Sequence, residues 1–498
     1  MAPAPCLSLA TPYPLPNSPT LLLVTTPRTL FIGLLGALLY LFLPTCVRAQ
    51  QVGVEDLRNT RVDGYRGIWF ALGKSYLYGD KYAGGLATYT AKHRPLAVYA
   101  PAVNKTYFVY GGTPAANQHR LLCMIGVYDH TTGRVERPTV VYDKGTVDDP
   151  HDNPVLSIDG NGYLWVFVSG RGTRRPGIKL RSRRPYSIAA FDIIAEEEFT
   201  YPQVWPTGGG FFHFFTKYSG FRNLYYERST DGNTWTDDAA LAQIKEAGQE
   251  RSGHYQVSAV DTLSGRLGTF FNRHPNGVVD RRTDLYYVQT DNEGTSWTTA
   301  AGEVLATPLR KRTSPARVID YAALGKNVYL KDMAYTAAGH PVCLYLTSNG
   351  PEPGPQNAPY EWQLTQWTGS NWQTRSLGLA DHNYDTGSLW LAGDSTWYAA
   401  LPGGSPPQPY GVGGEIMVYS SSDAGATWSG PVNLTRASRY NHGYVRTAVD
   451  ARAPFQLFWC DGHPQFSTAS HLYFGTVHGE VFRLPYRMME ETEAVERW

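Results

Sequence analysis

Histidine, tyrosine and basic side chains recur in this sequence at the edges of short apolar runs. His151 lies in the segment VDDPHDNP, directly before one such run, and Arg171 follows the end of that run. Tyr201 precedes a proline at the start of another run, Lys217 ends the run after it, and Tyr255 precedes a third. Imidazole and phenol groups suit proton transfer, and basic side chains suit an anion. We therefore treat these five residues as candidates for a functional site.

Two segments nearer the C-terminus concentrate the same types of residue. DHNYDTGSL contributes His382, Asn383 and Tyr384, and NHGYVRT contributes His442 and Arg446. Both segments are expected to be loops, and loops on a rigid scaffold commonly carry function. We interpret these five residues as substrate-binding candidates.

Short β-strands are the elements that would position these residues. Runs such as KTYFVYGG, YLWVFVSG, GFFHFFTKY and FQLFWCDG are short and rich in aromatic and β-branched residues, and runs of this kind are bounded by Gly, Asp, Asn or Pro. Aromatic residues make up 13% of the chain, with 50 glycines and 34 prolines, which favours many strands and turns. The sequence predicts an all-β protein. DDAALAQIKEAG, residues 237–248, is the best local candidate for a helix.

A polar turn motif with a tryptophan recurs along the chain. SSDAGATW ends at Trp428, STDGNTW at Trp235 and TDNEGTSW at Trp297, and QWTGSNW, ending at Trp372, is a weaker copy. The acidic or amide side chain caps a tight turn, and glycine supplies the positive φ. The motif resembles the Asp-box of sialidase-like propellers. Its spacing indicates a repeat of about 65 residues, as in stacked supersecondary units.

This repeat predicts the architecture. The chain after its first fifty residues accommodates about seven such units, so we expect a single seven-bladed β-propeller with Asp-box (BNR-like) repeats. Because a propeller gathers the ends of its inner strands around one axis, residues far apart in the sequence can meet at a common site.

The first 49 residues differ from the rest. Arg28 is followed by the apolar run TLFIGLLGALLYLFLP and by the small-x-small exit that ends at Ala49. This pattern predicts a secretory signal peptide over residues 1–49 and a propeller domain over residues 50–498. We expect a secreted, periplasmic or cell-surface protein, with an uncleaved N-terminal anchor as the alternative. No later stretch has the roughly 20 apolar residues of a membrane span.

Composition limits the partners. The net charge of +1 gives no electrostatic basis for binding nucleic acid or an anionic membrane. Cys123, Cys343 and Cys460 are too scattered for a disulfide framework or a zinc knuckle, so we expect buried thiols. No His, Asp or Glu set has metal-ligand spacing, although a structural calcium or zinc ion stays open. We expect a monomer.

The ordered loop motifs resemble one known family. HDNP, YPQ, GHY, DHNYDTGSL, GGEI with SSDAGATW, and NHGYVR are similar to the BNR-4 repeat family, which includes the propeller-type ulvan lyases. The resemblance implies cleavage of an acidic, uronate-bearing polysaccharide by β-elimination, a reaction that requires no cofactor. It needs a group that neutralises the carboxylate, a base for the C5 proton and an acid for the departing O4.

The resemblance also implies roles for residues. His151 and Tyr201 would share the base and acid roles, and Tyr255 would line the site. Lys217 stands where the family leads us to expect an arginine that faces the carboxylate, and Arg171 stands where we expect a second histidine. Lysine keeps the charge but lacks bidentate geometry, and arginine does not act as a base. Lys217, helped by Arg171, would still pair with the carboxylate, so these differences concern the identity of the polymer more than the elimination chemistry. Residues near the C-terminus would bind neighbouring sugars: His382, Asn383, Tyr384, His442 and Arg446.

Two alternatives remain open. A sialidase-like glycoside hydrolase would use a carboxylate, for which Glu415 is available, together with Arg446 on the substrate. A non-catalytic propeller that only binds glycans is the second alternative, and it is compatible with the unexpected residues at positions 171 and 217.

Overall fold

The computed structural model describes residues 56–116, 118–147, 149–219 and 221–498. The expected signal peptide lies outside these residues. Strands and loops dominate the described chain, and its only helices are the short 3₁₀ turns Pro101–Val103, Pro150–Asp152, Pro275–Gly277 and Pro355–Asn357. None of its helices has the length and apolar character that crossing a membrane demands. The prediction of an all-β protein is confirmed, and the described cysteines are buried free thiols.

Four of the sheets are regular. Each has four antiparallel strands that pair in the order in which they occur in the chain. Their strands are β10 (Pro154–Ile158), β11 (Leu164–Val168), β12 (Gly177–Ser182) and β13 (Phe191–Glu197); β14 (Thr200–Thr207), β15 (Gly210–Lys217), β16 (Asn223–Ser229) and β17 (Ala239–Ala242); β24 (Asn327–Tyr335), β25 (Pro341–Ser348), β26 (Tyr360–Trp367) and β27 (Trp372–Ala380); β28 (Ser388–Leu391), β29 (Trp397–Gly403), β30 (Glu415–Ser421) and β31 (Ser429–Asn433).

The remaining strands form larger or smaller sheets. One sheet lies between β17 and β24 and contains β18 (Gln256–Val260), β19 (Leu267–Arg273), β20 (Thr283–Thr290), β21 (Trp297–Thr298), β22 (Val304–Leu305) and β23 (Arg317–Ile319). The largest contains β5 (Ala97–Ala100), β6 (Lys105–Gly112), β7 (Leu122–Asp129), β8 (Arg134–Glu136), β9 (Thr139–Asp143), β32 (Asn441–Arg452), β33 (Phe455–Gly462), β34 (Leu472–Gly475), β35 (Val481–Arg483), β36 (Thr492–Ala494) and β37 (Glu496–Arg497). Two small ribbons pair β1 (Trp69–Ala71) with β4 (Ala83–Gly85) and β2 (Ser75–Tyr76) with β3 (Gly79–Asp80).

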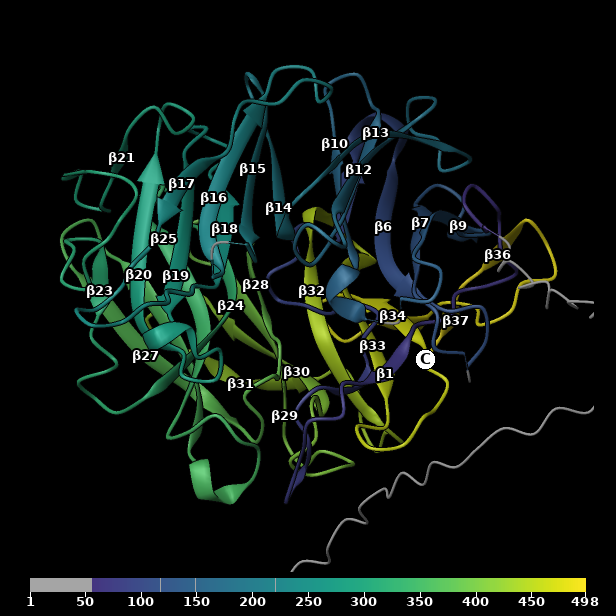
Figure 1. The fold of residues 1–498 in the computed structure, drawn as a ribbon. Helices are drawn as coiled ribbons and strands as arrows, with labels where there is room; N and C mark the ends of the chain where they lie inside the picture. The colour runs from purple at the N-terminus through teal and green to yellow at the C-terminus, as the bar shows by residue number, and fades with distance from the viewer. Residues whose placement is uncertain (1–55, 117, 148, 220) are drawn as a thin grey trace, which may run out of the picture. The chain divides into compact units, whose positions relative to one another are not determined.

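The first strands of successive sheets contact one another in a closed ring. β5 contacts β10, and the contacts continue through β14, β18, β24 and β28 to β32 (Figure 1). β32 then pairs in parallel with β5 at Val449 and Val98, which joins the beginning of the fold to its end. The ends of these strands therefore surround a common axis.

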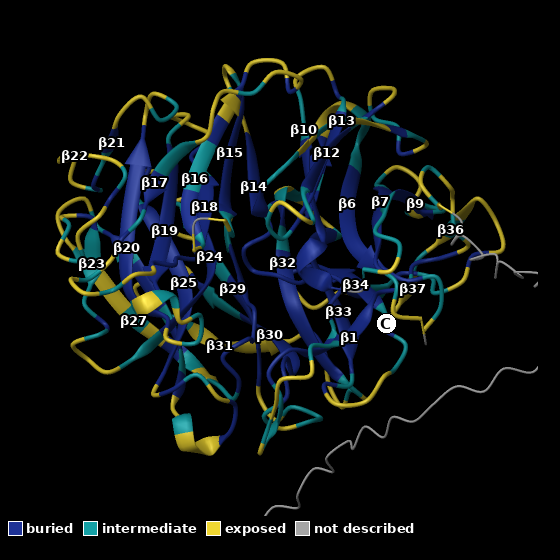
Figure 2. Cartoon of the chain, in the orientation of Figure 1, coloured by how far each residue is buried: buried dark blue, intermediate teal, exposed yellow. Residues whose placement is uncertain are grey.

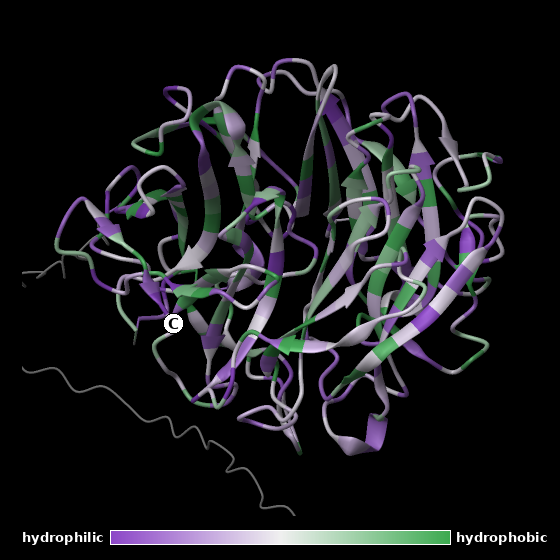
Figure 3. Cartoon of the chain, turned by 180° about the vertical axis from the view of Figure 1, so that it is seen from behind, coloured by the Kyte–Doolittle hydropathy of each residue, from purple (hydrophilic) through white to green (hydrophobic). Residues whose placement is uncertain are grey.

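Burial follows the position of a strand within its sheet. Inner strands such as β10 and β11 are almost wholly buried, whereas every residue of the outer strand β31 is exposed. Figure 2 shows the same gradation from dark blue strands to yellow loops. From behind, Figure 3 shows apolar stretches along the strands and polar residues at many of their ends. Because sheets cover both faces of an inner strand, these strands are mainly apolar, although β24 also buries Lys331 and Asp332.

The polar turns share one hydrogen-bond pattern. At the turn between β30 and β31, Oγ of Ser421 accepts from the Gly425 amide at 2.9 Å, and Oδ1 of Asp423 accepts from the Thr427 amide at 2.8 Å. Equivalent bonds close the turns between β16 and β17 and between β20 and β21. The central glycines have φ between +74° and +84°, as expected for these turns.

The helix expected over residues 237–248 is wrong. Its first half forms β17, which pairs with β16 through Ala239, Ala240 and Ala242. Leu241 and Ile244 are buried in the same core cluster. Tertiary pairing with an existing edge therefore outweighs the local helix propensity of the alanines.

Candidate active site

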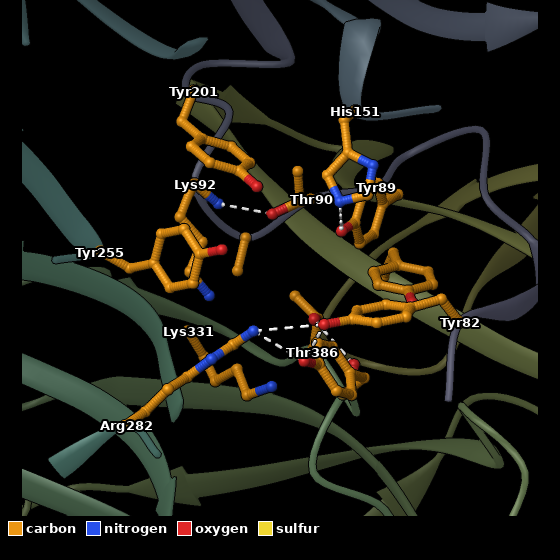
Figure 4. Close-up of a pocket in the computed structure, with 13 residues that line it drawn as sticks. Tyr82, Tyr89, Thr90, Lys92, His151, Tyr201, Tyr255, Arg282, Lys331 and Thr386 are labelled. Carbon is orange, nitrogen blue, oxygen red and sulfur yellow. Dashed lines mark hydrogen bonds between the residues drawn. The ribbon is translucent and has the colours of Figure 1, made fainter. Parts of the chain in front are cut away.

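The candidate site is a small cavity at the end of the ring where several of the inner strands begin. Its wall contains His151, three basic side chains and six tyrosines, which are Tyr82, Tyr89, Tyr201, Tyr255, Tyr384 and Tyr444 (Figure 4). The cavity volume is about 20 Å³. This space is comparable to one water molecule, so the described conformation is closed.

His151 is held at the cavity by an acidic side chain two residues earlier. It lies in the 3₁₀ turn Pro150–Asp152, and the side chain of Asp149 caps this turn. Nδ1 of His151 lies 2.6 Å from Oδ1 of Asp149, and Nε2 lies 2.7 Å from the Tyr89 hydroxyl. The imidazole is therefore fixed on one side and presents its other nitrogen to the cavity.

Asp149 is itself bound by two guanidinium groups. Its Oδ2 lies 2.7 Å from Arg171 and 2.8 Å from Arg175. Burial raises the pKa of Asp149, but the hydrogen bond to His151 and the charge of Arg171 outweigh it, so the pKa of this carboxyl is well below its usual range. Asp149 is thus an ionised carboxylate that orients His151.

Tyr201 and Tyr255 form the wall opposite Tyr89. Tyr201 lies near the start of β14, at an irregularity in its pairing with β15, and has a φ of +56°. Its ring packs edge-on against Tyr255 at 5.2 Å between centroids. Burial raises the pKa of Tyr201, and the neighbouring hydroxyl of Tyr218 raises it further. A left-handed conformation at a non-glycine residue is costly and frequently marks a functional position.

Three buried basic groups give the cavity its positive character. Arg282 donates to the Tyr384 hydroxyl at 2.6 Å, Lys92 donates to the Leu330 carbonyl at 3.0 Å, and Lys331 donates to the Asn383 carbonyl at 2.6 Å. No salt bridge involves these three side chains within the part of the chain that the structure describes. Burial and the charge of Arg282 lower the pKa of Lys92 well below its ordinary value. An incoming carboxylate would supply the missing counter-charge.

A hairpin near the start of the described chain closes the cavity. It comprises β2 and β3, and Tyr82 follows it. The hydroxyl of Tyr82 hydrogen-bonds that of Tyr384, and Arg282 also reaches Tyr82 at 3.3 Å. Lys81 pairs with Asp280, while Leu77 at the hairpin tip is 89% exposed. The contacts are thus made by two buried residues that directly follow a short hairpin with an exposed tip.

The structure brings four of the sequence-predicted residues into this cavity, and these are His151, Tyr201, Tyr255 and Tyr384. Arg171 lies behind the cavity, bound to Asp149. Lys217, at the end of β15, is not in the lining and pairs with Asp238 on a partly exposed surface. The described geometry therefore offers Lys217 no contact with a carboxylate in the cavity.

The other predicted binding residues have internal partners. Nδ1 of His382 accepts from the Tyr384 amide at 3.0 Å, and Asn383 donates to the Gly350 carbonyl at 3.2 Å. His442 accepts from Trp459 at 2.9 Å. Arg446 donates to the carbonyl of Thr90 at 2.6 Å, which anchors the segment that carries Lys92. In this structure these four residues support the wall rather than form it.

Sequence reasoning did not assign the basic residues or three of the tyrosines, Tyr82, Tyr89 and Tyr444, to the site. Arg282 lies in RRTDLYY, Lys331 inside β24, and Tyr82, Tyr89 and Lys92 precede the first long strand. For the basic residues, the only available signal in the sequence was a charged residue inside an apolar run, as in NVYLKDMAY around Lys331. That signal depends on knowing which strands are inner strands.

Glu415, the carboxylate that a hydrolase would require, lies elsewhere. Its oxygens accept hydrogen bonds from Thr435 and Ser438, and it is absent from the cavity lining. Among the described residues no group of three or more His, Cys, Asp or Glu side chains is arranged to hold a metal ion.

Residues 107–379 match the family described as BNR repeat-containing family member, and this segment is more than half of the chain. The protein belongs to the BNR repeat-containing family. It is 22% identical to the ulvan lyase of Alteromonas sp. (strain LOR) over 328 residues, 56% of this chain and 64% of that protein. The chain thus spans less than two thirds of the length of this curated relative.

Solved structures are similar to the whole fold. A structure described as a new family of polysaccharide lyase, PL25 ulvan lyase, has a TM-score of 0.65 at 15% identity, covering 85% of this chain and 96% of that one. A second PL25 ulvan lyase structure, bound to -[GlcA(1-4)Rha3S]-, has a TM-score of 0.65 at 14% identity, with coverage of 85% and 96%. The resemblance to ulvan lyases is confirmed, and at these identities the structures show the fold alone.

Proposed function

We propose that this protein is a polysaccharide lyase that cleaves an acidic, uronate-containing polysaccharide by β-elimination. The observation that carries the proposal is the closed cavity itself: three buried basic groups without a salt bridge in the described chain face the same space as His151 and Tyr201. Basic groups and proton-transfer groups are the two requirements of the reaction. The family and the fold shared with ulvan lyases support the same assignment.

In this mechanism the basic residues act on the uronate carboxylate. Arg282 would bind it, with Lys331 beside it and Lys92 across the Tyr255 ring as further basic groups. Neutralising the carboxylate makes the C5 proton acidic because charge that develops on removal of this proton spreads into the carboxyl group. Arg282 takes the role that the sequence suggested for Lys217, which pairs instead with Asp238.

His151 and Tyr201 would carry the proton transfers. Both line the cavity, with their ring centroids 6.1 Å apart, so both groups could act on the same sugar residue once the cavity has opened. Asp149 fixes the imidazole, and the edge-on contact with Tyr255 fixes the phenol ring. One group removes the C5 proton and the other protonates O4 as the glycosidic bond breaks.

Substrate entry requires the cavity to open. A volume of about 20 Å³ cannot hold a sugar ring, so the Tyr82–Tyr384 contact and the β2–β3 hairpin must move first. Opening exchanges the hydroxyl contact and the ring packing of Tyr82 against Tyr384, and the substrate offers hydroxyl and carboxylate groups that replace the polar part. Loop closure over a bound substrate is a common step in enzyme catalysis.

The finer features of the fold and setting belong to the same proposal. The ring of first strands and the shared turn geometry support a seven-bladed β-propeller with Asp-box turns. We further propose that residues 50–498 form a monomeric catalytic domain, that the protein is secreted or lies in the periplasm or at the cell surface, and that its chemistry needs no cofactor. The polymer would be ulvan or another uronate polysaccharide.

A direct assay tests the lyase proposal. The full chain would be incubated with ulvan and with other uronate polysaccharides while the ultraviolet absorbance of unsaturated uronate ends is followed. We expect absorbance to rise and His151→Ala to abolish the rise. Reducing ends without absorbance would indicate hydrolysis, which Glu415→Gln would then test. Binding of the polymers without any product would favour the glycan-binding alternative.

A further inference from the structure

Tyr218 lies directly behind Tyr201. It follows the last residue of β15, and its hydroxyl lies 3.2 Å from the Tyr201 hydroxyl. Two guanidinium groups flank its ring, with Cζ of Arg222 4.5 Å and Cζ of Arg171 5.2 Å from the centroid. Tyr218 is outside the cavity lining, so it can reach the substrate only through Tyr201.

The charged surroundings of Tyr218 are positive on balance. The nearby carboxylate of Glu198 accepts hydrogen bonds from the amide and hydroxyl of Ser219, and Tyr218 has no hydrogen bond to it among the described contacts. Arg222 is anchored by its own backbone, which accepts from the His254 amide at 3.0 Å. The guanidinium groups are therefore held near the Tyr218 ring by structure that does not depend on the substrate.

Arg171 connects the two proton-transfer side chains. Its guanidinium contacts Asp149, which orients His151, and lies over the ring of Tyr218, which contacts Tyr201. A histidine at this position could not provide both contacts with a permanent charge. The arginine therefore supports both sides of the site from behind.

We propose that Tyr218 is the proton partner of Tyr201, a positioning residue that accepts the Tyr201 hydroxyl proton while Tyr201 removes a proton from the substrate. This inference rests on the proposed lyase function. It assigns the base role to Tyr201 and the acid role to His151, and it gives Arg171 and Arg222 the task of stabilising the Tyr218 oxygen.

The step balances in atoms and charge. Tyr218 begins as a phenolate. The C5–H bond breaks and its proton forms an O–H bond with Tyr201, whose own proton forms an O–H bond with Tyr218. The C–H electron pair forms the C4=C5 double bond as the C4–O4 bond breaks, and O4 takes a proton from His151. Return of one proton from Tyr218 to His151 through solvent restores the site.

The electrostatics of the pair agree with this direction of transfer. Burial raises the pKa of Tyr218, but the charges of Arg171 and Arg222 outweigh it, so the pKa is lowered overall. Burial raises the pKa of Tyr201, and the Tyr218 charge raises it further. A proton shared between the two phenols is thus favoured on Tyr201 until the substrate proton arrives.

Tyr218→Phe tests the proposal by two independent measurements. Spectrophotometric titration of the full chain should show one tyrosine that ionises well below the ordinary pKa of about 10, and this ionisation should be lost in the variant. In the lyase assay kcat should fall at least about 10²-fold, as for loss of acid–base assistance, while KM stays near the wild-type value. An unchanged kcat with an unchanged pH profile would overturn the proposal.

Matched variants separate a proton role from a structural one. Arg222→Gln should raise the low tyrosine pKa and lower kcat, whereas Arg222→Lys, which keeps the charge, should restore most of both. Tyr225→Phe is the control, because Tyr225 on β16 is partly buried and lies outside the cavity lining. The Tyr225→Phe variant should leave kcat and the tyrosine ionisation below the ordinary pKa unchanged.

The two proposals fail in distinguishable ways. If the wild-type chain releases no unsaturated product from any polymer, the lyase function fails. If no early ionisation disappears in Tyr218→Phe, the assignment of Tyr218 fails even when the wild-type chain is an active lyase.

Discussion

Oδ1 of Asp149 lies 2.6 Å from Nδ1 of His151. The other oxygen of this carboxylate is occupied by Arg171 and Arg175, so the carboxylate cannot rotate without breaking two ion pairs. The imidazole is consequently oriented by a group that is itself fixed, and the Nε2 atom points to the cavity without help from the substrate.

Asp149→Asn should therefore impair catalysis more than binding. The amide leaves Arg171 and Arg175 without their counter-charge and loses the charged hydrogen bond that orients the His151 imidazole. We expect kcat to fall about 10²–10⁴-fold, the range of acid–base assistance, with a small change in KM. Asp192→Asn is the control, because Asp192 pairs with Arg183 on the exposed surface. Equal kcat values for both variants would argue against an orienting role.

Neutralising Arg282 should lower kcat/KM strongly, whereas neutralising Lys217 should change it little. Arg282→Met removes a buried cation that lines the cavity and should lower kcat/KM on a uronate polymer about 10²–10³-fold, as for loss of one preorganised donor. Lys217→Met breaks only a partly exposed ion pair with Asp238, which is worth about 0–1 kcal/mol. Its kcat/KM should remain within about threefold of wild type. The reverse ranking would return the carboxylate role to Lys217.

Stability should decline in mild acid because of buried histidines. Burial lowers the pKa of His382 to about 3, whereas the unfolded side chain titrates near about 6.5. The unfolded state therefore binds more protons between these values, and the free energy of unfolding falls as the pH drops through this window. The slope for one such group is about 1.4 kcal/mol per pH unit.

His382→Asn tests this acid dependence. Asparagine can still accept from the Tyr384 amide but has no proton to bind. Chemical denaturation between pH 7 and pH 4 should show a shallower loss of stability in the variant than in wild type. Parallel curves would assign the acid sensitivity to other buried groups, of which His254, with a pKa lowered by burial to about 4, is the next to test.

Gly425 should tolerate no side chain. Its φ is +79°, and a Cβ there would lie 2.5 Å from the indole of Trp397. Gly425→Ala should lower the free energy of unfolding by about 1–3 kcal/mol through backbone strain and this overlap. Gly430→Ala, where a Cβ meets nothing within 4 Å, should be close to neutral. Lyase activity at low temperature should be unaffected by either change.

Much of the fold could be predicted from the sequence, but only part of the site could. Strand-like runs and the Trp428 turn predicted an all-β chain because both signals are local. His151 and Tyr201 could be singled out because they precede strands, where a side chain reaches the end of a sheet. Arg282 gave no such signal, because its importance depends on which strand ends share an axis. Lys217 was misleading for the same reason: its position at a strand end does not reveal that Asp238 lies beside it.

The cavity joins the two ends of the described chain, and this has a consequence for biosynthesis. Tyr82 meets Tyr384, and nearby Trp69 donates to the carbonyl of His463 at 2.7 Å. The ring itself is completed by the β5–β32 pairing. A chain that has not yet formed its last sheet therefore lacks the contact of Arg446 with the Thr90 carbonyl, which anchors the segment that carries Lys92. Under the proposed function, the site would be complete only once β32 is in place.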